Sequence, residues 1–246
     1  WGFPATISSD VQVMRDRPAR GYWTEFGEEM GGLEVGVHVA GYIAEAAVSL
    51  DHTDTPELVE AADMALEAAV DEAGPGVEVG VVGQAIEDVI RGYGYTPVLN
   101  LSGHGVERYD AHTGPTVPNR GVDRSVELAP GQAVAIEPFA TDGRGKVGEG
   151  TDEEIYELER SRSVRDRRAR ETLEAIEAFD GLPFAARWLE GDRVNMSLRR
   201  LKQANAIKGY PVLKEADGAL VSQAEHTLLI TDDGVEVTTA GIHSFD

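Results

Sequence analysis

The sequence of 246 residues contains no cysteine and only four lysines. The absence of cysteine excludes disulfide bonds and thiolate metal ligands, so histidine and carboxylate side chains remain as the strong metal ligands. The sequence also lacks an apolar run of about 18 residues, which excludes a membrane-spanning helix. Because no basic and apolar leader is present either, we expect a cytoplasmic protein.

Basic residues are scarce as a group: the chain has 22 of them against 44 acidic residues, a net charge of -22. This charge opposes binding to nucleic acids and anionic membranes, so we expect neither as a partner. The acidic residues are spread along the chain, for instance over 51–60 and 152–159, as on a solvated surface. Dispersed acidity with few lysines resembles proteins of salt-loving archaea, in which concentrated salt screens self-repulsion.

The length and the hydrophobic content of 41% allow one α/β domain or two small ones. The chain opens on Trp1 without an initiator methionine, which we interpret as an internal point of a longer domain. We expect a monomer.

Residues 33–50 carry a strong hairpin signal, two β-rich runs around a two-residue turn at Ala40-Gly41. This turn predicts that Val39 lies opposite Tyr42. The same register puts Glu34 and Glu45 on one face of the sheet as diagonal neighbours, about 7–8 Å apart at the backbone. Two acidic side chains on one sheet face are therefore expected.

Apolar residues at helical spacing predict a helix over 56–73, with Asp54 or Thr55 as its N-cap, and a second helix over 79–93 that ends at Gly94. Two further helices, over 165–179 and 196–205, are predicted to form a polar excursion between sheet segments. Its arginine-rich stretch 160–170 is most simply a solvated face.

Residues 100–118, NLSGHGVERYDAHTGPTVP, place His104 and His112 eight residues apart. The segment contains too much glycine and proline for a helix, so we expect short extended pieces joined by tight turns. Two interpretations of the histidines stay open at this point, hydrogen-bonded structural residues or functional ones.

Two apolar runs carry a buried acid. Residues 133–140 are predicted to form a short strand ended by Pro138 and contain Glu137, and residues 221–230 contain Glu225 and are predicted to pair with 235–239. A carboxylate in such a strand costs free energy unless it is paired or ligated. The glycine-rich loop 142–150 lacks the Lys-Ser/Thr of a phosphate loop.

Taken together, these candidates suggest one metal site. Four carboxylates and one imidazole around a cavity suit a pair of divalent cations, which can clamp and activate a water. The candidate ligands are Glu34, Glu45, His104, Glu137 and Glu225.

The stretches NLSGHGVERYDAHTG, AVAIEPFATDG, LPFAARWL, GYPVLKE and QAEHT resemble the type II methionine aminopeptidases, and the resemblance runs from Gly2 to the end of the chain. It implies the α/β (α+β) pita-bread fold, with a pseudo-twofold antiparallel sheet and a single catalytic domain over 1–246. It also implies a helical insertion at about 160–207 and two divalent metal ions (cobalt, manganese, iron, zinc or nickel). The implied reaction removes the initiator methionine of nascent chains, near the ribosome, when the second residue is small.

Carried over by position, the resemblance implies that His104, Glu137 and Glu225 are metal ligands and that Glu137 manages the proton of the attacking water. His112 would contact the substrate and stabilise the tetrahedral intermediate.

The chain departs from the family at three positions. Family members have Asp where this chain has Glu34 and Glu45, and a Glu is longer by one bond of roughly 1.5 Å. Arg15 stands where a catalytic His belongs, and a permanent cation cannot replace a neutral imidazole. The family also has about a further fifth of chain before Gly2, whose loss would expose apolar sheet surface and favour aggregation.

These departures predict an impaired enzyme. The alternatives are a catalytically inactive pita-bread protein that binds a peptide or protein, and another peptidase of this fold such as a proline-specific one. The helical excursion and the GYPVLKE stretch fit the type II methionine aminopeptidases better than they fit a proline-specific peptidase.

Overall fold

A computed structural model describes residues 8–13, 30–215 and 218–240. The chain divides into two compact units, one built mainly from residues before 149 and after 214, the other mainly from residues 149–214. We call them unit 1 and unit 2. No helix among the described residues is long and apolar enough to cross a membrane.

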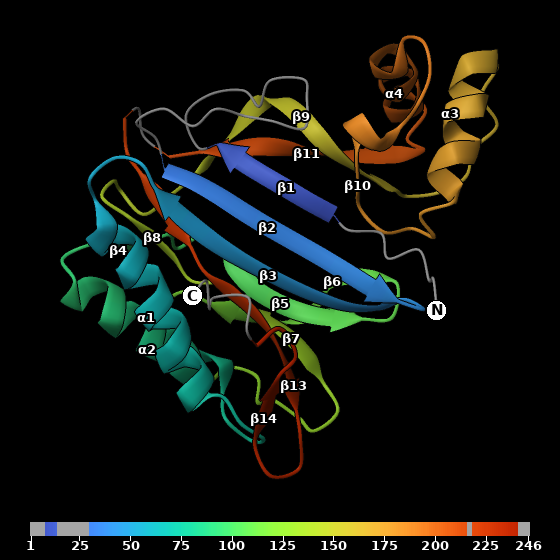
Figure 1. Ribbon diagram of the computed structural model, residues 1–246. Helices are drawn as coiled ribbons and strands as arrows, with labels where there is room; N and C mark the ends of the chain where they lie inside the picture. Colours follow the sequence, from blue (N-terminus) through green and yellow to red (C-terminus); the bar gives the residue numbers. More distant parts are fainter. Residues whose placement is uncertain (1–7, 14–29, 216–217, 241–246) are drawn as a thin grey trace. The chain divides into compact units, whose positions relative to one another are not determined.

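Unit 1 is built on a sheet with the strand order β1-β2-β3-β13-β7-β5-β6, and β14 pairs with β13 (Figure 1). Neighbouring strands from β1 to β5 in this order run antiparallel. The sheet joins segments far apart in sequence, since β3 is followed across the sheet by β13. The strands are β1 (Ser8–Val13), β2 (Met30–Val39), β3 (Tyr42–Asp51), β5 (Ser102–Glu107), β6 (Asp110–Pro118), β7 (Ala133–Ile136), β13 (Glu225–Ile230) and β14 (Val235–Val237).

The hairpin β2–β3 confirms the predicted register. Val39 lies opposite Tyr42 and Gly36 opposite Glu45, with Ala40 and Gly41 in the turn. Both turn residues have positive φ, 52° and 87°, as a two-residue turn between twisted strands requires.

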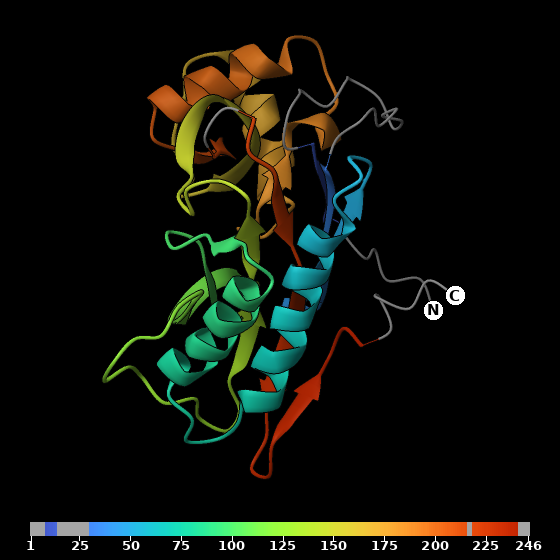
Figure 2. The ribbon, with the colours of Figure 1, turned by 90° about the vertical axis from the view of Figure 1, so that its left-hand side faces the viewer.

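Two helices cover one face of this sheet, α1 (Pro56–Glu72) and α2 (Val79–Gly92) (Figure 2). Both were predicted, and Thr55 is the N-cap of α1. Their apolar sides pack on alternate residues of the central strands. That core includes Leu58 and Ile86 from the helices and Val134, Ile136, Leu228 and Ile230 from β7 and β13.

Two of the expected strands are broken. The run 133–140 forms β7 and then β8 (Phe139–Thr141), which belong to different sheets. Pro138 lies at the break, where a residue without an N–H cannot continue the hydrogen-bonded ladder. The run 221–230 is divided in the same way, into β12 (Val221–Gln223) and β13, so β8 pairs with β12 and β4 (Thr96–Pro97) in a sheet of its own.

Unit 2 combines a sheet of order β10-β9-β11 with two helices. The aromatic ring of Phe184 stacks on Phe179 in its core. The acidic stretch 152–159, predicted only as solvated surface, lies almost entirely in strand β9. The elements are β9 (Gly148–Leu158), α3 (Arg167–Glu177), β10 (Phe184–Ala185), a short 3-10 helix (Ala186–Trp188), α4 (Val194–Gln203) and β11 (Ile207–Lys214). The two helices were predicted; the limits of an insertion at 160–207 stay a prediction.

Candidate metal centre

Strand register brings the predicted acidic residues to one face of the large sheet. Glu34 in β2 lies opposite Ala47 in β3, and Ala47 lies opposite Glu225 in β13. Residues directly opposite each other in an antiparallel sheet point to the same side. Glu45 is two residues from Ala47 and therefore shares this side.

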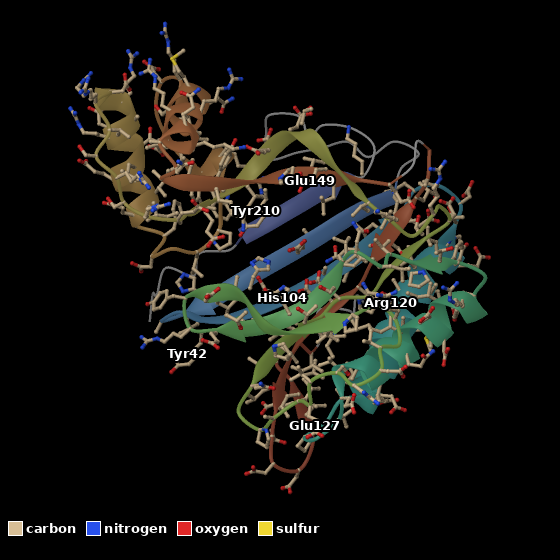
Figure 3. All side chains as sticks on the ribbon, turned by 180° about the vertical axis from the view of Figure 1, so that it is seen from behind. Tyr42, His104, Arg120, Glu127, Glu149 and Tyr210 are labelled. Carbon is tan, nitrogen blue, oxygen red and sulfur yellow. The ribbon has the colours of Figure 1, made fainter. Side chains whose placement is uncertain are left out.

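A second row on the same face leads to the histidine. Thr227 lies opposite Ala135 in β7, and Ala135 lies opposite His104 in β5. Thr227 is two residues from Glu225, so both rows face the same way. Glu137 directly follows β7, and its carboxylate reaches His104 on this face. The opposite face is the one that α1 and α2 cover. Figure 3 shows His104 against the strands of this sheet.

The side chains meet at His104. Its Nε2 atom is 3.4 Å from Glu137 Oε1 and 4.0 Å from Glu45 Oε2. One potential ligand atom from each of Glu45, His104 and Glu225 lies within 4.8 Å of the other two. The exposed ring of His112 has its centroid 4.4 Å from that of His104. Both histidines of the 100–118 segment therefore belong to one cluster, and β5 and β6 are the expected extended pieces.

The cluster is buried and rich in negative charge. Glu225 is 2% exposed, and the side chains of Glu45, His104 and Glu137 are 14–15% exposed. Burial, followed by the charge of Glu34, raises the pKa of Glu45 from 4.5 to about 8. Burial raises the pKa values of Glu137 and Glu225 well above their usual range as well, and the neighbouring carboxylates add to the effect.

The donor set fits a divalent cation. Within the described part of the chain, Glu45 Oε2 and Glu225 Oε2 are buried and have no hydrogen-bond partner. Such oxygens are costly unless a cation or a proton neutralises them. Carboxylate oxygens and an imidazole nitrogen are ligands that Mn, Fe, Co and Zn accept. The structure thus brings together Glu45, His104 and Glu225 as a possible metal-binding group, with Glu137 in contact.

Of the two remaining predicted site residues, Glu34 and Arg15, the structure describes only Glu34. Glu34 is close enough for its charge to raise the pKa values of Glu45, Glu137 and Glu225. Arg15 lies outside the described residues.

Two further residues support the cluster and carry no role in the sequence-based prediction. The hydroxyl of Thr227 accepts a hydrogen bond from Glu45 N at 2.7 Å and donates one to Glu45 O at 2.9 Å. The amide Nε2 of Gln223 donates to Glu137 Oε2 at 3.4 Å. Both belong to the QAEHT stretch. They lie two residues before and two residues after Glu225, and this spacing was the feature of the sequence that could have identified them.

Known proteins of similar sequence are metallopeptidases. The family model for metallopeptidase family M24 matches residues 27–189. The methionine aminopeptidase of Archaeoglobus fulgidus is 44% identical over 239 residues, covering 96% of this chain and 82% of that protein. That of Methanocaldococcus jannaschii is 41% identical over 241 residues, with coverages of 96% and 82%.

Solved structures give the same fold. A thermophilic Arx1 superimposes with a TM-score of 0.77 at 16% identity, covering 95% of this chain and 74% of that one. The methionine aminopeptidase of Thermotoga maritima has a TM-score of 0.60 at 23% identity, with coverages of 95% and 72%. These likenesses confirm the predicted pita-bread fold with its curled antiparallel sheet, and with the extent of the sequence match they show that the chain belongs to metallopeptidase family M24.

Proposed function

We propose that this protein removes the N-terminal methionine from polypeptides in a metal-dependent hydrolysis. The observation that carries the proposal is the convergence of Glu45, His104, Glu137 and Glu225 from four separate strand regions on one buried cluster. The identity of 40–44% to archaeal proteins named methionine aminopeptidase supports the choice of substrate.

We propose two divalent cations at this cluster, whose ligands would be Glu34, Glu45, His104, Glu137 and Glu225. When bound, the cations would polarise the scissile carbonyl group and lower the pKa of the attacking water. The orphaned oxygens of Glu45 and Glu225 support this assignment.

Glu137 is the residue we assign to proton transfer. Its Oε1 contacts His104 Nε2, and its Oε2 accepts a hydrogen bond from Gln223, so the carboxylate is held in place at both oxygens. A carboxylate fixed in this way can take the proton of the attacking water and deliver it to the leaving amine.

His112 is the residue we assign to the substrate. Its ring lies beside that of His104, yet the residue is exposed and so accessible to a peptide. An N–H of this ring can donate to the oxygen that becomes negative in the tetrahedral intermediate. The substrate would be the N-terminal methionine of a nascent chain, in the cytoplasm, acted on by a monomer.

We further propose that the activity of this chain is reduced. Glu34 and Glu45 each carry an extra methylene compared with the family's Asp, whereas working sites tolerate misplacement of only about 0.5 Å. Arg15 in place of a histidine removes a group that can exchange a proton. These same departures motivate the second candidate function, a peptide-binding protein that has lost its catalytic activity.

Methionine release from a Met-Ala-Ser peptide, with added manganese or cobalt, tests the proposal. We expect His104→Ala to lower the rate by at least about a hundredfold. His52→Ala is the matched control, because His52 is exposed and lies outside the cluster. An equal loss in both variants would contradict the assigned site.

Restoring the family residues separates the two candidate functions. We expect the triple variant Arg15→His, Glu34→Asp, Glu45→Asp to hydrolyse the peptide at least about tenfold faster, since it corrects misplaced ligands. Calorimetric titration with manganese should show two-site uptake by the original chain. Absence of metal uptake by a folded original chain would favour the peptide-binding protein.

A further inference from the structure

The charge of this protein is divided unevenly between its parts. Residues 149–214, which make up most of unit 2, contain 13 basic and 13 acidic residues, whereas the other 180 residues contain 9 basic and 31 acidic ones. The whole net charge of -22 therefore lies outside 149–214. A conclusion about partners that rests on the net charge of the chain does not apply to unit 2.

Two segments hold most of the basic residues of unit 2. Residues 160–170 include six arginines and a single acid, Asp166. Residues 193–214 include six basic residues and no acid. In a chain with twice as many acidic as basic residues, two such segments in one unit are unexpected.

The fold places these two segments side by side. The guanidinium of Arg200 in α4 forms an ion pair with Asp166, the N-cap of α3. The backbone N–H groups of Glu159 and Arg160 donate to Ala206 O at 3.0 and 3.2 Å. The apolar sides of α3 and α4 share one core. The arginines and lysines of 160–170 and 193–208 thus form one surface, which we call the basic patch; Figure 3 shows nitrogen-tipped side chains standing out from these two helices.

The basic patch opposes the stability of α3. The first turn of this helix contains Arg167, Arg168 and Arg170 and no acid. Positive charge near a helix N-terminus is unfavourable by about 0.3–1 kcal/mol for each residue, because it meets the positive end of the helix dipole. All three arginines are exposed. Within this turn, Arg167 forms an ion pair with Glu171, and Arg170 donates to two backbone carbonyl groups. A ligand of opposite charge would offset the unfavourable charge that remains.

We propose that the basic patch binds the phosphate backbone of structured RNA. Ten of the 13 basic residues in 149–214 are arginines, whose planar guanidinium groups bind phosphate through two parallel N–H donors. A nucleic acid duplex presents about one negative charge per 1.7 Å of its axis, which matches a dense group of cations. For unit 2 this proposal departs from the expectation of no nucleic-acid partner.

Two other partners fit the patch less well. A membrane-binding surface needs apolar side chains among the basic ones, and in the fully described segment 149–214 the exposed large hydrophobic residues are only Met196 and Val212. A second copy of this chain has its net negative charge dispersed over the 180 residues outside 149–214, and its dense acidic stretch 152–159 is in part paired within its own chain, through Glu153 and Lys202. The choice of RNA over DNA rests on the proposed function, since nascent chains emerge from an RNA particle.

Fluorescence anisotropy of a labelled RNA duplex of about 20 base pairs tests the proposal. The test variant replaces Arg162, Arg165, Arg168 and Arg199 by Gln; all four are exposed, and none belongs to the ion pairs Arg167–Glu171, Arg200–Asp166 and Lys202–Glu153. The control variant replaces four exposed arginines of unit 1, Arg91, Arg120, Arg124 and Arg144, by Gln. Both variants lose the same total charge.

We expect the original chain and the control variant to bind the duplex with equal affinity. The test variant should bind it at least about tenfold more weakly. The slope of log K against log salt concentration should be about three to four units shallower for the test variant than for the original chain. Equal affinity of the two variants, or no binding by the original chain, would overturn the proposal. Tighter binding to a DNA duplex of the same sequence, to vesicles containing phosphatidylserine, or to a second copy in sedimentation would also overturn it. Methionine release by the test variant should be unchanged, so a failure of RNA binding and a failure of the peptidase assignment are separate results.

Discussion

Replacing Glu45 by Gln should reduce the loss of stability that the metal-free protein shows as the pH rises. The pKa of Glu45 is about 8 in the folded chain, against an ordinary value of 4.5. Between these two values the folded state holds a proton that the unfolded state has lost. Stability that depends on this proton is present below pH 4.5 and is lost as the pH rises toward 8.

The magnitude follows from the width of that window. Each pH unit costs about 1.4 kcal/mol of unfolding free energy per group, so at pH 7 the metal-free protein should be about 3 kcal/mol less stable than the Gln variant. This is a large share of the roughly 5–15 kcal/mol by which proteins are stable. With a slope of about 2 kcal/mol per molar urea, the midpoint should differ by about 1.5 M.

Urea unfolding of chelator-treated protein, followed by circular dichroism at several pH values between about 5 and 8, measures this difference. Saturating manganese should restore the original chain by about 3 kcal/mol at a hundred times its dissociation constant and should restore the Gln variant less. The stability difference between the two proteins therefore narrows on adding metal. If both proteins lose stability equally from pH 5 to 8 without metal, Glu45 is not the buried acid that the structure describes.

Two further substitutions probe the support of the site. Gly105→Ala would place a Cβ atom 2.0 Å from Gly114 O, so it should lower stability by about 3 kcal/mol in thermal unfolding and disturb the neighbouring His104. Gly92→Ala, whose Cβ would meet nothing within 4 Å, should instead be neutral or stabilising; a similar loss in both would exclude the steric explanation. Gln223→Ala removes the donor to Glu137 Oε2 and should lower kcat about tenfold, while the urea midpoint stays near that of the original chain. An unchanged kcat would show that the 3.4 Å contact is not needed to orient Glu137.

The parts of the fold that local rules determine could be predicted from the sequence. The β2–β3 register follows from a two-residue turn and a side-chain period of two, and both hold over 39–42 whatever the rest of the chain does. Helices α1 and α2 follow from apolar spacing and from Gly94, which has a φ of 84°. Strands β1 and β9 were not predicted, because β9 contains acids on both faces and neither shows clear alternation.

The convergence of the site could be predicted only in part, because it depends on pairings between distant strands. Ala47 and Glu225 are direct partners although 178 residues separate them, and no local pattern specifies such a pairing. The individual acids were identifiable, since a carboxylate in an apolar run is costly. Their meeting at His104 was suggested by the family resemblance and by the chemistry of the ligand types.

Once the strand order is known, the side-chain period of two determines which residues face the site. Every second residue of β3, β13 and β7 faces α1 and α2, and the residues between them face the cluster. The cluster face alternates acids with small residues, Gly36 and Ala47 beside Glu34 and Glu45, and Ala135 beside His104. Because directly opposite residues share one face, we expect a larger side chain at these positions to extend into the space in which the ligands meet. The size of the site is therefore set by small residues that are not ligands themselves. A search of the sequence for ligand types finds the acids and the histidine, but it does not give the space available to the longer side chains of Glu34 and Glu45.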